Sequence, residues 1–585
     1  MHKLKWQGII FSGFLFFMVF AIPSQSFAGD EVEELKAQLN QMNQQMMMLQ
    51  EKLEKLENAS TEKADEIAEI DERLNKAELH TASDKLSWGV EMRTSAESIH
   101  YDDALFAPGW LVNMFFMDYN SMNPMNGGLN GIPADMVPTL MGGFASMNIP
   151  PEKVSLDNNI IYTTKFRLNM KAKINSQLDF AGRLAAYKVW GDSTGVKFNG
   201  GSLGDVTFDG NTTSLPHGDI IHLERAYFNY KSRMGDVPVN FSLGRRPSTD
   251  GPPMEYGNYS LEGGSPYTPI INWQFDGASL AFGLEDLTGI PGFDFKLCYG
   301  VGFEGDWGNS SSLNTTRPDV EDVHLFGFIT TLFDDGRMSA GINYAHASKI
   351  TDGFTGTTVM PFIVSKQDLT GGGVDGTEPD GIPEYYFEAN TGGYISRIEP
   401  MTNIGDWDAA SLLLRANLAE FSDDLPDIDL FFSGSWTHTS PTHVSTNPFY
   451  EMMGQGLLSS NGILESHDGY GIWAGAVFPM PGDARFGIEY NWGSKYWFSF
   501  TGAEDSLIGS KAATRGQVFE GYYIYPVFKD NFFVKLGGRY YDYDYTGSGN
   551  PLGAPVKISE AMALDSLNSI VDKVWSAYAS ATLRW

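Results

Sequence analysis

Residues 573–585, KVWSAYASATLRW, alternate between two kinds of side chain. From Trp575 onward, one face carries tryptophan, alanine and leucine, while the other carries serine, threonine, tyrosine and arginine. A period of two marks a strand whose two faces meet different surroundings. The stretch ends on the aromatic Trp585 with no turn after it. A last strand that is apolar outside and polar inside is typical of bacterial outer-membrane barrels, and an ordinary soluble strand is the alternative.

The same alternation recurs backwards along the chain as far as residue 85. In 162–173, tyrosine, phenylalanine, leucine and methionine alternate with lysine, arginine and asparagine. The predicted strands are 85–98, 160–174, 177–190, 219–231, 237–245, 270–284, 292–304, 321–333, 337–348, 406–420, 428–438, 468–478, 484–498, 514–527, 532–545 and 573–585. They predict an all-β fold, a transmembrane antiparallel up-and-down β-barrel of about 16 strands that occupies residues 83–585. The phase of the alternation is ambiguous in 270–284 and 321–333.

The connections between these strands alternate between short and long. Short connections include 175–176, 334–336, 479–483 and 529–531, and long ones include 102–158, 191–218, 246–269, 349–404, 439–467 and 546–572. Outer-membrane barrels have short periplasmic turns and long external loops. An even number of strands then places both ends of the barrel on the periplasmic side. A soluble sandwich has no reason to sort its loop lengths by side.

Composition excludes several other classes of protein. The chain has 585 residues, a formal net charge of −33 and a mean hydropathy of −0.22. No apolar run of about 18 residues follows residue 28, so a helical membrane bundle is not expected. The negative charge argues against nucleic acid as a partner, and the single cysteine, Cys298, leaves no internal disulfide. Because the sequence has no Walker, GxSxG, HExxH or CxxCH motif, we expect neither an enzyme nor a cofactor.

Residues 1–28 are typical of a secretory signal peptide. Lys3 and Lys5 form a basic region, residues 9–22 are almost wholly apolar, and 26–28 supply a small–x–small cleavage site. An uncleaved membrane anchor is the alternative. Export without a helical anchor, together with the barrel pattern, predicts a protein of the bacterial outer membrane that is surrounded by outer-membrane lipid.

Residues 29–82 follow a heptad period instead. Apolar residues recur every three or four positions at Val32, Leu35, Leu39, Met42, Met46, Leu49, Leu53 and Leu56, and in the same register at Ile67, Ile70, Leu74 and Ala77. This pattern predicts a periplasmic coiled coil, and opposite charges in flanking positions favour a parallel association of identical chains. We expect a homotrimer joined through this coil. A hairpin that turns at 58–61, or a lone amphipathic helix, is the alternative.

Three stretches of the predicted barrel carry a family resemblance. They are RLAAYKVWGDS (183–193), ERAYFNY (224–230) and FSLGRRPSTDGPP (241–253). They resemble motifs of a bacterial outer-membrane family of unknown function that is described as porin-like. A coiled coil placed before a barrel is also similar to the arrangement in phosphate-selective-type porins. The resemblance implies a barrel and a transport function, and it supplies no catalytic residues.

The third long connection, 246–269, is a candidate constriction. It is rich in proline and glycine and carries Asp250, Glu255 and Glu262. In general porins the third external loop folds inward and narrows the lumen. Acidic residues that face a basic wall create a transverse field at a constriction. The basic residues expected at this constriction are Lys165, Arg167, Lys171, Lys173, Arg183, Arg225 and Arg246. Alternatively, these bases are ordinary lumen residues paired with neighbours such as Asp179.

Two other long connections have unusual compositions. The first contains Met114, Met117, Met122, Met125, Met136, Met141 and Met147 among aromatic residues. Methionine-rich surfaces adapt to hydrophobic solutes and thioethers suit Cu(I), but packing over the barrel mouth or against a neighbouring protomer is the interpretation that we favour. The connection 349–404 carries Asp375, Glu378, Asp380 and Glu384 among glycines. These four are weak candidates for Ca²⁺ ligands, because their spacing is not that of an EF-hand. A solvated acidic loop, or one bridged by divalent ions at the cell surface, is favoured.

Together these features predict a porin-like channel for the passive diffusion of small hydrophilic solutes. Inward positions of the predicted strands carry more bases than acids, which predicts a weak preference for anions. A structural tether between outer membrane and periplasm, a scaffold barrel for a partner protein, and an uptake channel for hydrophobic solutes are the alternatives.

Overall fold

The chain divides into two compact units, Met1–His80 and Thr81–Trp585. The computed structural model describes residues 86–112, 131–191, 221–247, 269–272, 274–305, 320–352, 356–358, 362–368, 371–372, 378–389, 396–398, 400–422, 424–501, 506–529, 531–567 and 569–585. The predicted signal peptide, 1–28, and coiled coil, 29–82, lie outside these residues. The second unit is described below.

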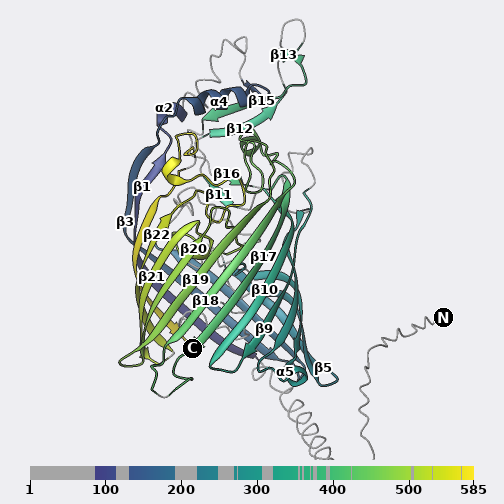
Figure 1. Cartoon of the computed structure of the whole chain (residues 1–585), viewed down its shortest axis with the longest axis vertical. Helices are drawn as coiled ribbons and strands as arrows, with labels where there is room; N and C mark the ends of the chain where they lie inside the picture. Colours follow the sequence, from purple (N-terminus) through teal and green to yellow (C-terminus); the bar gives the residue numbers. More distant parts are fainter. Residues whose placement is uncertain are drawn as a thin grey trace, which may run out of the picture. The chain divides into compact units, whose positions relative to one another are not determined.

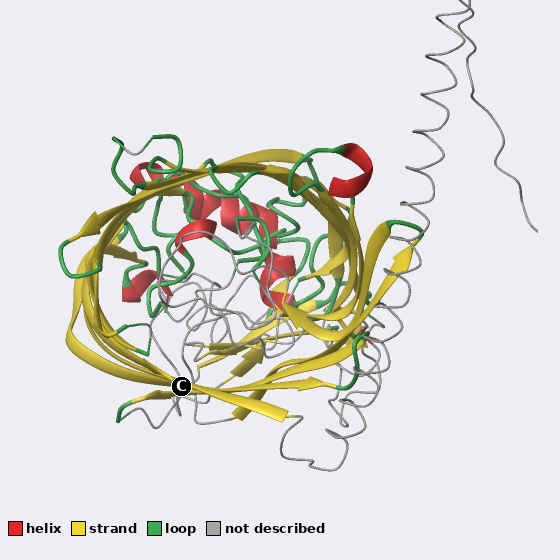
Figure 2. Cartoon of the chain, turned by 90° about the horizontal axis from the view of Figure 1, so that it is seen from below, coloured by secondary structure: helices red, strands yellow, loops and turns green. Residues whose placement is uncertain are grey.

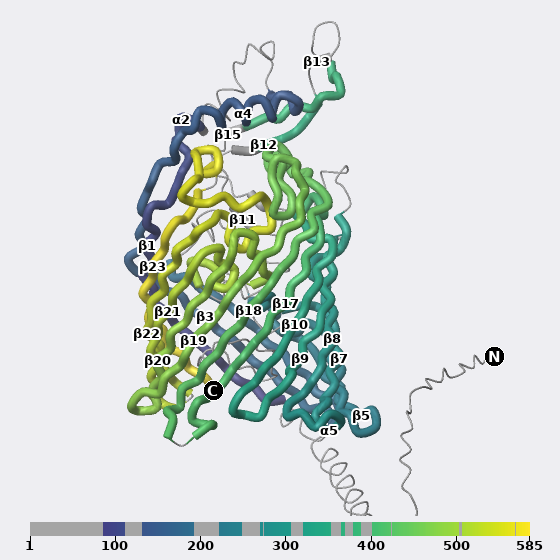
Figure 3. The backbone as a smooth tube through the Cα atoms, in the orientation of Figure 1, coloured from purple at the N-terminus to yellow at the C-terminus, as the bar shows by residue number. Residues whose placement is uncertain are grey.

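The second unit is built on a closed antiparallel β-barrel of sixteen strands (Figure 1). Its strands are β1 (Leu86–Phe106), β3 (Glu152–Lys173), β4 (Leu178–Val189), β5 (Ile221–Met234), β6 (Val237–Pro247), β7 (Gln274–Gly283), β8 (Asp294–Phe303), β9 (Val323–Asp334), β10 (Met338–Thr351), β17 (Asn403–Asn417), β18 (Asp429–Pro441), β19 (His467–Met480), β20 (Ala484–Gly493), β21 (Gly516–Phe528), β22 (Phe532–Tyr543) and β23 (Lys573–Arg584). Each predicted strand is confirmed. Figure 3 shows the chain passing up and down between sequence neighbours, for example from β7 through β10 to β17 and β18.

The barrel closes where β23 pairs with β1. Arg584 lies opposite Glu91, and beyond it Trp585 and Val90 exchange two backbone hydrogen bonds of 2.7 and 2.9 Å. The alternation of β23 has the predicted direction, since Trp575 and Leu583 are 40% and 48% exposed on the outside while Thr582 is 1% exposed inside. Similar outward apolar side chains follow the other strands, among them Trp88, Met92, Phe166, Leu243, Phe326, Leu414, Phe432, Ile488, Phe519 and Leu536. No helix within the described ranges has the length and apolar character needed to span a membrane.

The connections sort by length between the two ends of the barrel (Figure 1). The short connections, one of which contains α5 (Glu285–Thr288), lie at the end where β23 finishes. The long connections lie at the opposite end. They contain α2 (Gly109–Val112), β2 (Ile132–Pro133), α4 (Val137–Ser146), β11 (Gly356–Thr358), β12 (Phe362–Gln367), β13 (Gly371–Gly372), β14 (Glu378–Pro379), β15 (Glu384–Ala389), β16 (Ser396–Ile398), α7 (Pro448–Met452), η5 (Lys511–Ala513) and η6 (Ile558–Glu560).

Strand β20 is shorter than its predicted span, 484–498. It ends at Gly493, where a Cβ atom would meet the carbonyl oxygen of Thr514 at 2.1 Å and the ring of Trp497 at 2.7 Å. The indole Nε1 of Trp497 donates to the carbonyl of Ala512 at 2.7 Å. The Thr514 carbonyl and the Trp497 ring thus leave no room for a side chain at position 493, where β20 ends.

An apolar core fills part of the barrel interior beside β9, β10 and β17. Leu325 of β9 and the fully buried Trp407 of β17 belong to the same cluster as Phe498 and Phe500 of the connection 494–515. The indole N–H of Trp407 donates to the carbonyl of Phe498 at 3.1 Å, and its ring meets the Phe500 ring edge-on with centroids 4.7 Å apart. This core explains the ambiguous phase of 321–333, since both faces of β9 are apolar: Leu325 packs inward while Phe326 is 51% exposed outside.

Candidate pore lining

Four of the predicted basic residues lie buried on the inner wall of the barrel. Lys165 and Arg167 come from β3, Arg183 from β4 and Arg225 from β5, with exposed fractions between 2% and 9%. The alternation of β3 and β4 positions the first three. The acid that pairs with two of them, Arg167 and Arg183, is Glu224, a residue that the sequence did not single out. Arg167 donates to both of its carboxylate oxygens, at 3.0 Å from Nε and 2.8 Å from Nη2, and Arg183 Nε lies 3.9 Å from the same carboxylate.

A β-bulge turns Glu224 into the lumen. Arg183 pairs with Arg225, but the next residue along β4, Leu184, pairs with Leu223, so Glu224 is an extra residue in β5. As a result Glu224 and Arg225 both point inward, with exposed fractions of 1% and 2%. A bulge places two consecutive side chains on one face, which simple alternation cannot anticipate. One signal was present: the apolar outward positions change from odd (221, 223) to even (228, 230) along this strand.

Glu91 is a second acid of this group. Its carboxylate lies 3.5 Å from Arg167 Nη1 and 3.6 Å from Arg584 Nε, so it links β1 to β3 and β23. Asp179, which we considered as a partner for the bases, instead accepts from Lys231 at 2.6 Å and from the side-chain amide of Asn229 at 2.8 Å. Arg167 and Arg183 are thus paired with Glu91 and Glu224 rather than with Asp179.

The other predicted constriction residues are not brought into this group. Lys171 is half-buried and Lys173 exposed, nearer the end of β3. Arg246 donates from Nε to the hydroxyl of Ser242 at 2.7 Å and lies 5.9 Å from the centre of the Tyr227 ring. Asp250, Glu255 and Glu262 lie outside the described residues, so a constriction by the third long connection stays a prediction.

A different connection reaches into the lumen, and the sequence did not suggest it. Lys511, in η5 of the connection 494–515, lies 2.6 Å from Glu489 of β20 and 2.5 Å from Glu520 of β21. Glu520 also accepts from Arg539 Nε at 3.1 Å and from the hydroxyl of Tyr578 at 2.6 Å. Seen along the barrel axis, helices and loops overlap the interior of the ring of strands (Figure 2). Lys511 thus attaches this connection to the wall through two acids buried on the inner face.

The end of the third long connection is attached to the same segment. Phe500 donates its backbone N–H to the carbonyl of Ile270 at 2.9 Å, and Asn272 donates to the carbonyl of Phe500 at 3.1 Å. Ile270 is 1% exposed and belongs to the apolar core inside the barrel. The described part of the predicted constriction loop is therefore held by the connection 494–515.

The methionine-rich first connection packs over the barrel mouth in its described part. Phe144 of α4 is buried in a cluster with Phe387 of β15 and Phe449 of α7, and Met141 packs against this cluster. Lys366 of β12 joins the connection 349–404 to the connection 442–466 through an ion pair of 2.7 Å with Glu451 of α7. Met114, Met117, Met122 and Met125 lie outside the described residues.

Of the four acidic candidates for Ca²⁺ ligands, Glu378, Asp380 and Glu384 lie within the described residues. Asp375 lies outside the described residues, Glu378 pairs in β14, Asp380 accepts the backbone N–H of Ile382 at 2.8 Å, and Glu384 is 4% exposed in β15. Among the residues that the structure describes, no three His, Cys, Asp or Glu side chains are grouped so that they could hold a metal ion.

Two buried ionisable groups hold the long connections together outside the strands. The guanidinium of Arg515 donates to the carbonyls of Trp497, Thr546 and Asn550 at 2.9–3.0 Å, and its complete burial lowers its pKa to about 9. Asp352 follows β10 and accepts from the backbone N–H groups of Met401 and Thr402 and from the hydroxyl of Ser445. Burial raises the pKa of Asp352 despite these bonds.

Comparison with known proteins identifies the family. A family described as "Protein of unknown function (DUF3373)" matches residues 155–585. The chain belongs to this family. This agrees with the resemblance seen in 183–253 as far as membership of a family of unknown function is concerned. No curated protein matches the chain.

Solved structures of outer-membrane proteins match only distantly. OprB of Pseudomonas putida is 10% identical with a TM-score of 0.36, and the match covers 86% of this chain and 94% of that one. OmpT of Vibrio cholerae is also 10% identical, with a TM-score of 0.35 and coverage of 86% and 99%. The same identity, TM-score and coverage describe the match to an anion-selective porin from Comamonas acidovorans.

Proposed function

We propose that the protein is a porin-like channel of the bacterial outer membrane that lets small hydrophilic solutes diffuse passively, with a weak preference for anions. The observation that carries this proposal is the division of one closed wall into an apolar outer face and a charged inner face. An outer face of this kind suits lipid, and a charged interior suits water and dissolved ions. The short-connection end, where both ends of the barrel lie, would face the periplasm.

The charge preference follows from the inner wall. It is supported by the sequence, because the inward positions of the predicted strands carry more bases than acids. Lumen charges set the sign of the ions that a wide pore favours. The net charge of −33 then belongs largely to the connections and to residues 29–82.

Planar-bilayer recording on the purified mature protein tests this function. Under a salt gradient we expect single-channel steps and a small reversal potential with the sign of anion preference. A clear cation preference would contradict the charge assignment. Complete absence of conductance from correctly folded protein would contradict the channel itself, and would favour a tether or a scaffold barrel.

We further propose that residues 29–82 join three chains through a coiled coil. The support is the heptad register that persists across Ser60 and Lys63. Chemical cross-linking of the mature protein should give trimers, and a chain that begins at residue 83 should lose them while keeping a folded barrel. Trimers that persist without residues 29–82 would show that the barrel, not the coil, carries the association.

A further inference from the structure

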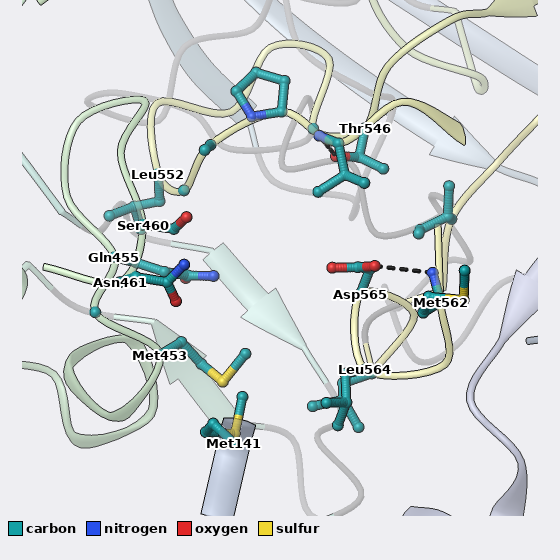
Figure 4. A pocket seen from close by; sticks show the side chains of 18 of the residues that line it. Met141, Met453, Gln455, Ser460, Asn461, Thr546, Leu552, Met562, Leu564 and Asp565 are labelled. Atoms are coloured by element: carbon teal, nitrogen blue, oxygen red, sulfur yellow. Dashed lines mark hydrogen bonds between the residues drawn. The ribbon is translucent and has the colours of Figure 1, made fainter. Parts of the chain in front are cut away.

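A cavity of about 950 Å³ lies at the long-connection end of the barrel. It is lined mainly by residues from three stretches that are far apart in sequence, 134–149 with α4, 444–462 with α7, and 543–571 (Figure 4). This volume is at the upper end of the range for small-molecule pockets, which is about 300–1,000 Å³. Neither the buried bases of the inner wall nor Glu91 and Glu224 line this cavity.

Part of the cavity wall is apolar and includes two methionines. The side chains of Met141, from α4, and Met453, which follows α7, extend toward the same space, and Leu564 lies beside them (Figure 4). Phe144 and Phe449 line the cavity next to them and belong to the buried cluster at the barrel mouth. Methionine side chains are flexible and polarisable, so this surface can fit apolar groups of different shape.

Uncharged polar groups lie beside Met453. The side chains of Gln455, Ser460 and Asn461 lie together above it, on the same side of the cavity (Figure 4). None of the three makes a side-chain hydrogen bond with any residue that the structure describes. Amide and hydroxyl groups that line a pocket without a protein partner are available to a ligand.

Among the described residues that line the cavity, no accessible positive side chain could bind an acidic ligand. Arg515 is 0% exposed behind the three carbonyls to which it donates. Glu451 is paired with Lys366 at 2.7 Å. Asp565, which accepts the backbone N–H of Met562 at 2.8 Å, is exposed and would repel a carboxylate.

We propose that this cavity binds an uncharged amphipathic organic molecule, with its apolar body against Met141 and Met453 and its hydrogen-bonding group on Gln455 and Asn461. The size of the cavity, its apolar residues Met141, Met453 and Leu564, and its neutral polar side chains together define this class of ligand. The site goes beyond the proposed channel, because binding does not require an open lumen. A protein that fails to conduct can still bind, and a conducting protein can fail to bind.

Fluorescence titration with N-phenyl-1-naphthylamine tests the site on the full mature protein in lipid nanodiscs. This probe is neutral and has an aromatic body and one N–H donor. We expect saturable binding that Gly142→Trp weakens at least ten-fold. Gly142 lines the cavity, and no atom lies within 4 Å of a Cβ added there, so the indole would fill the space without disturbing α4.

Gly143→Trp is the matched control. Gly143 is the next residue of α4, has the same open surroundings and does not line the cavity, so this variant should bind as the unmodified protein does. Asn461→Ala should weaken binding by about five-fold, the value of one ordinary hydrogen bond of about 1 kcal/mol. Equal binding by the Gly142→Trp and Gly143→Trp variants would overturn the site.

Competition between the probe and molecules of different charge tests whether the ligand is uncharged. We expect 1-octanol to displace the probe from the unmodified protein more effectively than octanoate or octylammonium does at equal free concentration. Preferential displacement by octanoate would overturn the assignment to uncharged ligands, and so would preferential displacement by octylammonium, which would instead point to Asp565.

Discussion

Arg167 on β3 and Glu224 on β5 form a two-bond ion pair across the strand that separates them. The carboxylate of Glu224 has no exposed surface, and Arg167 also reaches Glu91 on β1. Arg167 and its two acids thus link β1, β3 and β5 on the inner wall. Because removal of one partner leaves a buried charge without its counter-charge, such a pair is costly to break even when it contributes little net stability.

We expect Glu224→Ala to lower the free energy of unfolding by about 3–5 kcal/mol. The measurement is equilibrium urea unfolding of the barrel in lipid vesicles. Lys153→Ala is the control, because Lys153 pairs with Asp103 at 3.0 Å on the exposed surface, where an ion pair contributes less than about 1 kcal/mol. Equal losses for the two variants would show that Glu224 is not the acid that holds the buried bases.

Lys511 is expected to keep the connection 494–515 inside the lumen. Lys511→Met removes both of its ion pairs, with Glu489 and Glu520, and should increase single-channel conductance or the frequency of large openings. Lys495→Met is the matched control on the same connection. Lys495 lies 4.9 Å from the centre of the Tyr496 ring, and the structure shows it in no ion pair with a described carboxylate. Unchanged conductance in the Lys511 variant would mean that its ion pairs do not restrict the pore.

Leu536 tests whether the outer face of β22 meets lipid. Its side chain is 50% exposed near the middle of the strand. Leu536→Arg should lower the free energy of unfolding by about 2–4 kcal/mol in bilayers, the cost of an arginine on the lipid face near the midplane. Leu287→Arg, in α5 of a short connection, should cost far less because that position is 72% exposed outside the strands. A tolerated arginine at 536 would argue against a lipid-facing surface there.

Because Asp352 is buried among the long connections, we expect the stability of the protein to depend on pH. Burial raises its pKa in the folded protein above the ordinary value of 3.8. Below pH 3.8 the carboxyl is protonated in both the folded and the unfolded protein, so its contribution to the free energy of unfolding is fully present. That contribution is lost as pH rises through the raised pKa of the folded protein. Relative to the unmodified protein, Asp352→Asn should become progressively more stable against thermal unfolding as pH rises from 4. Asp380→Asn, in an exposed turn, should not show this trend, and a difference of opposite sign at Asp352 would contradict the prediction.

The inner wall shows which inward-facing residues a period of two predicts and which it misses. It correctly placed Lys165, Arg167 and Arg183 inside, because strands without irregularities keep a period of two. It missed Glu224, because one extra residue in β5 changes which positions face inward. It was also ambiguous on β9, where the inner face is apolar because it packs against Trp407 and the connection 494–515 rather than facing water.

What the sequence by itself determined is the wall: the number and direction of the strands, the sorting of connections by length, and the two-faced character of Trp575 to Trp585. These features are local or periodic, so each can be read from neighbouring residues. Only the tertiary structure decided what lies inside and above that wall. The pairing of Arg167 with Glu224, the position of Lys511 between two acids and the cavity beside Met141 and Met453 all join residues from distant connections. Their contacts depend on how those connections pack together, and no period along the chain encodes that packing.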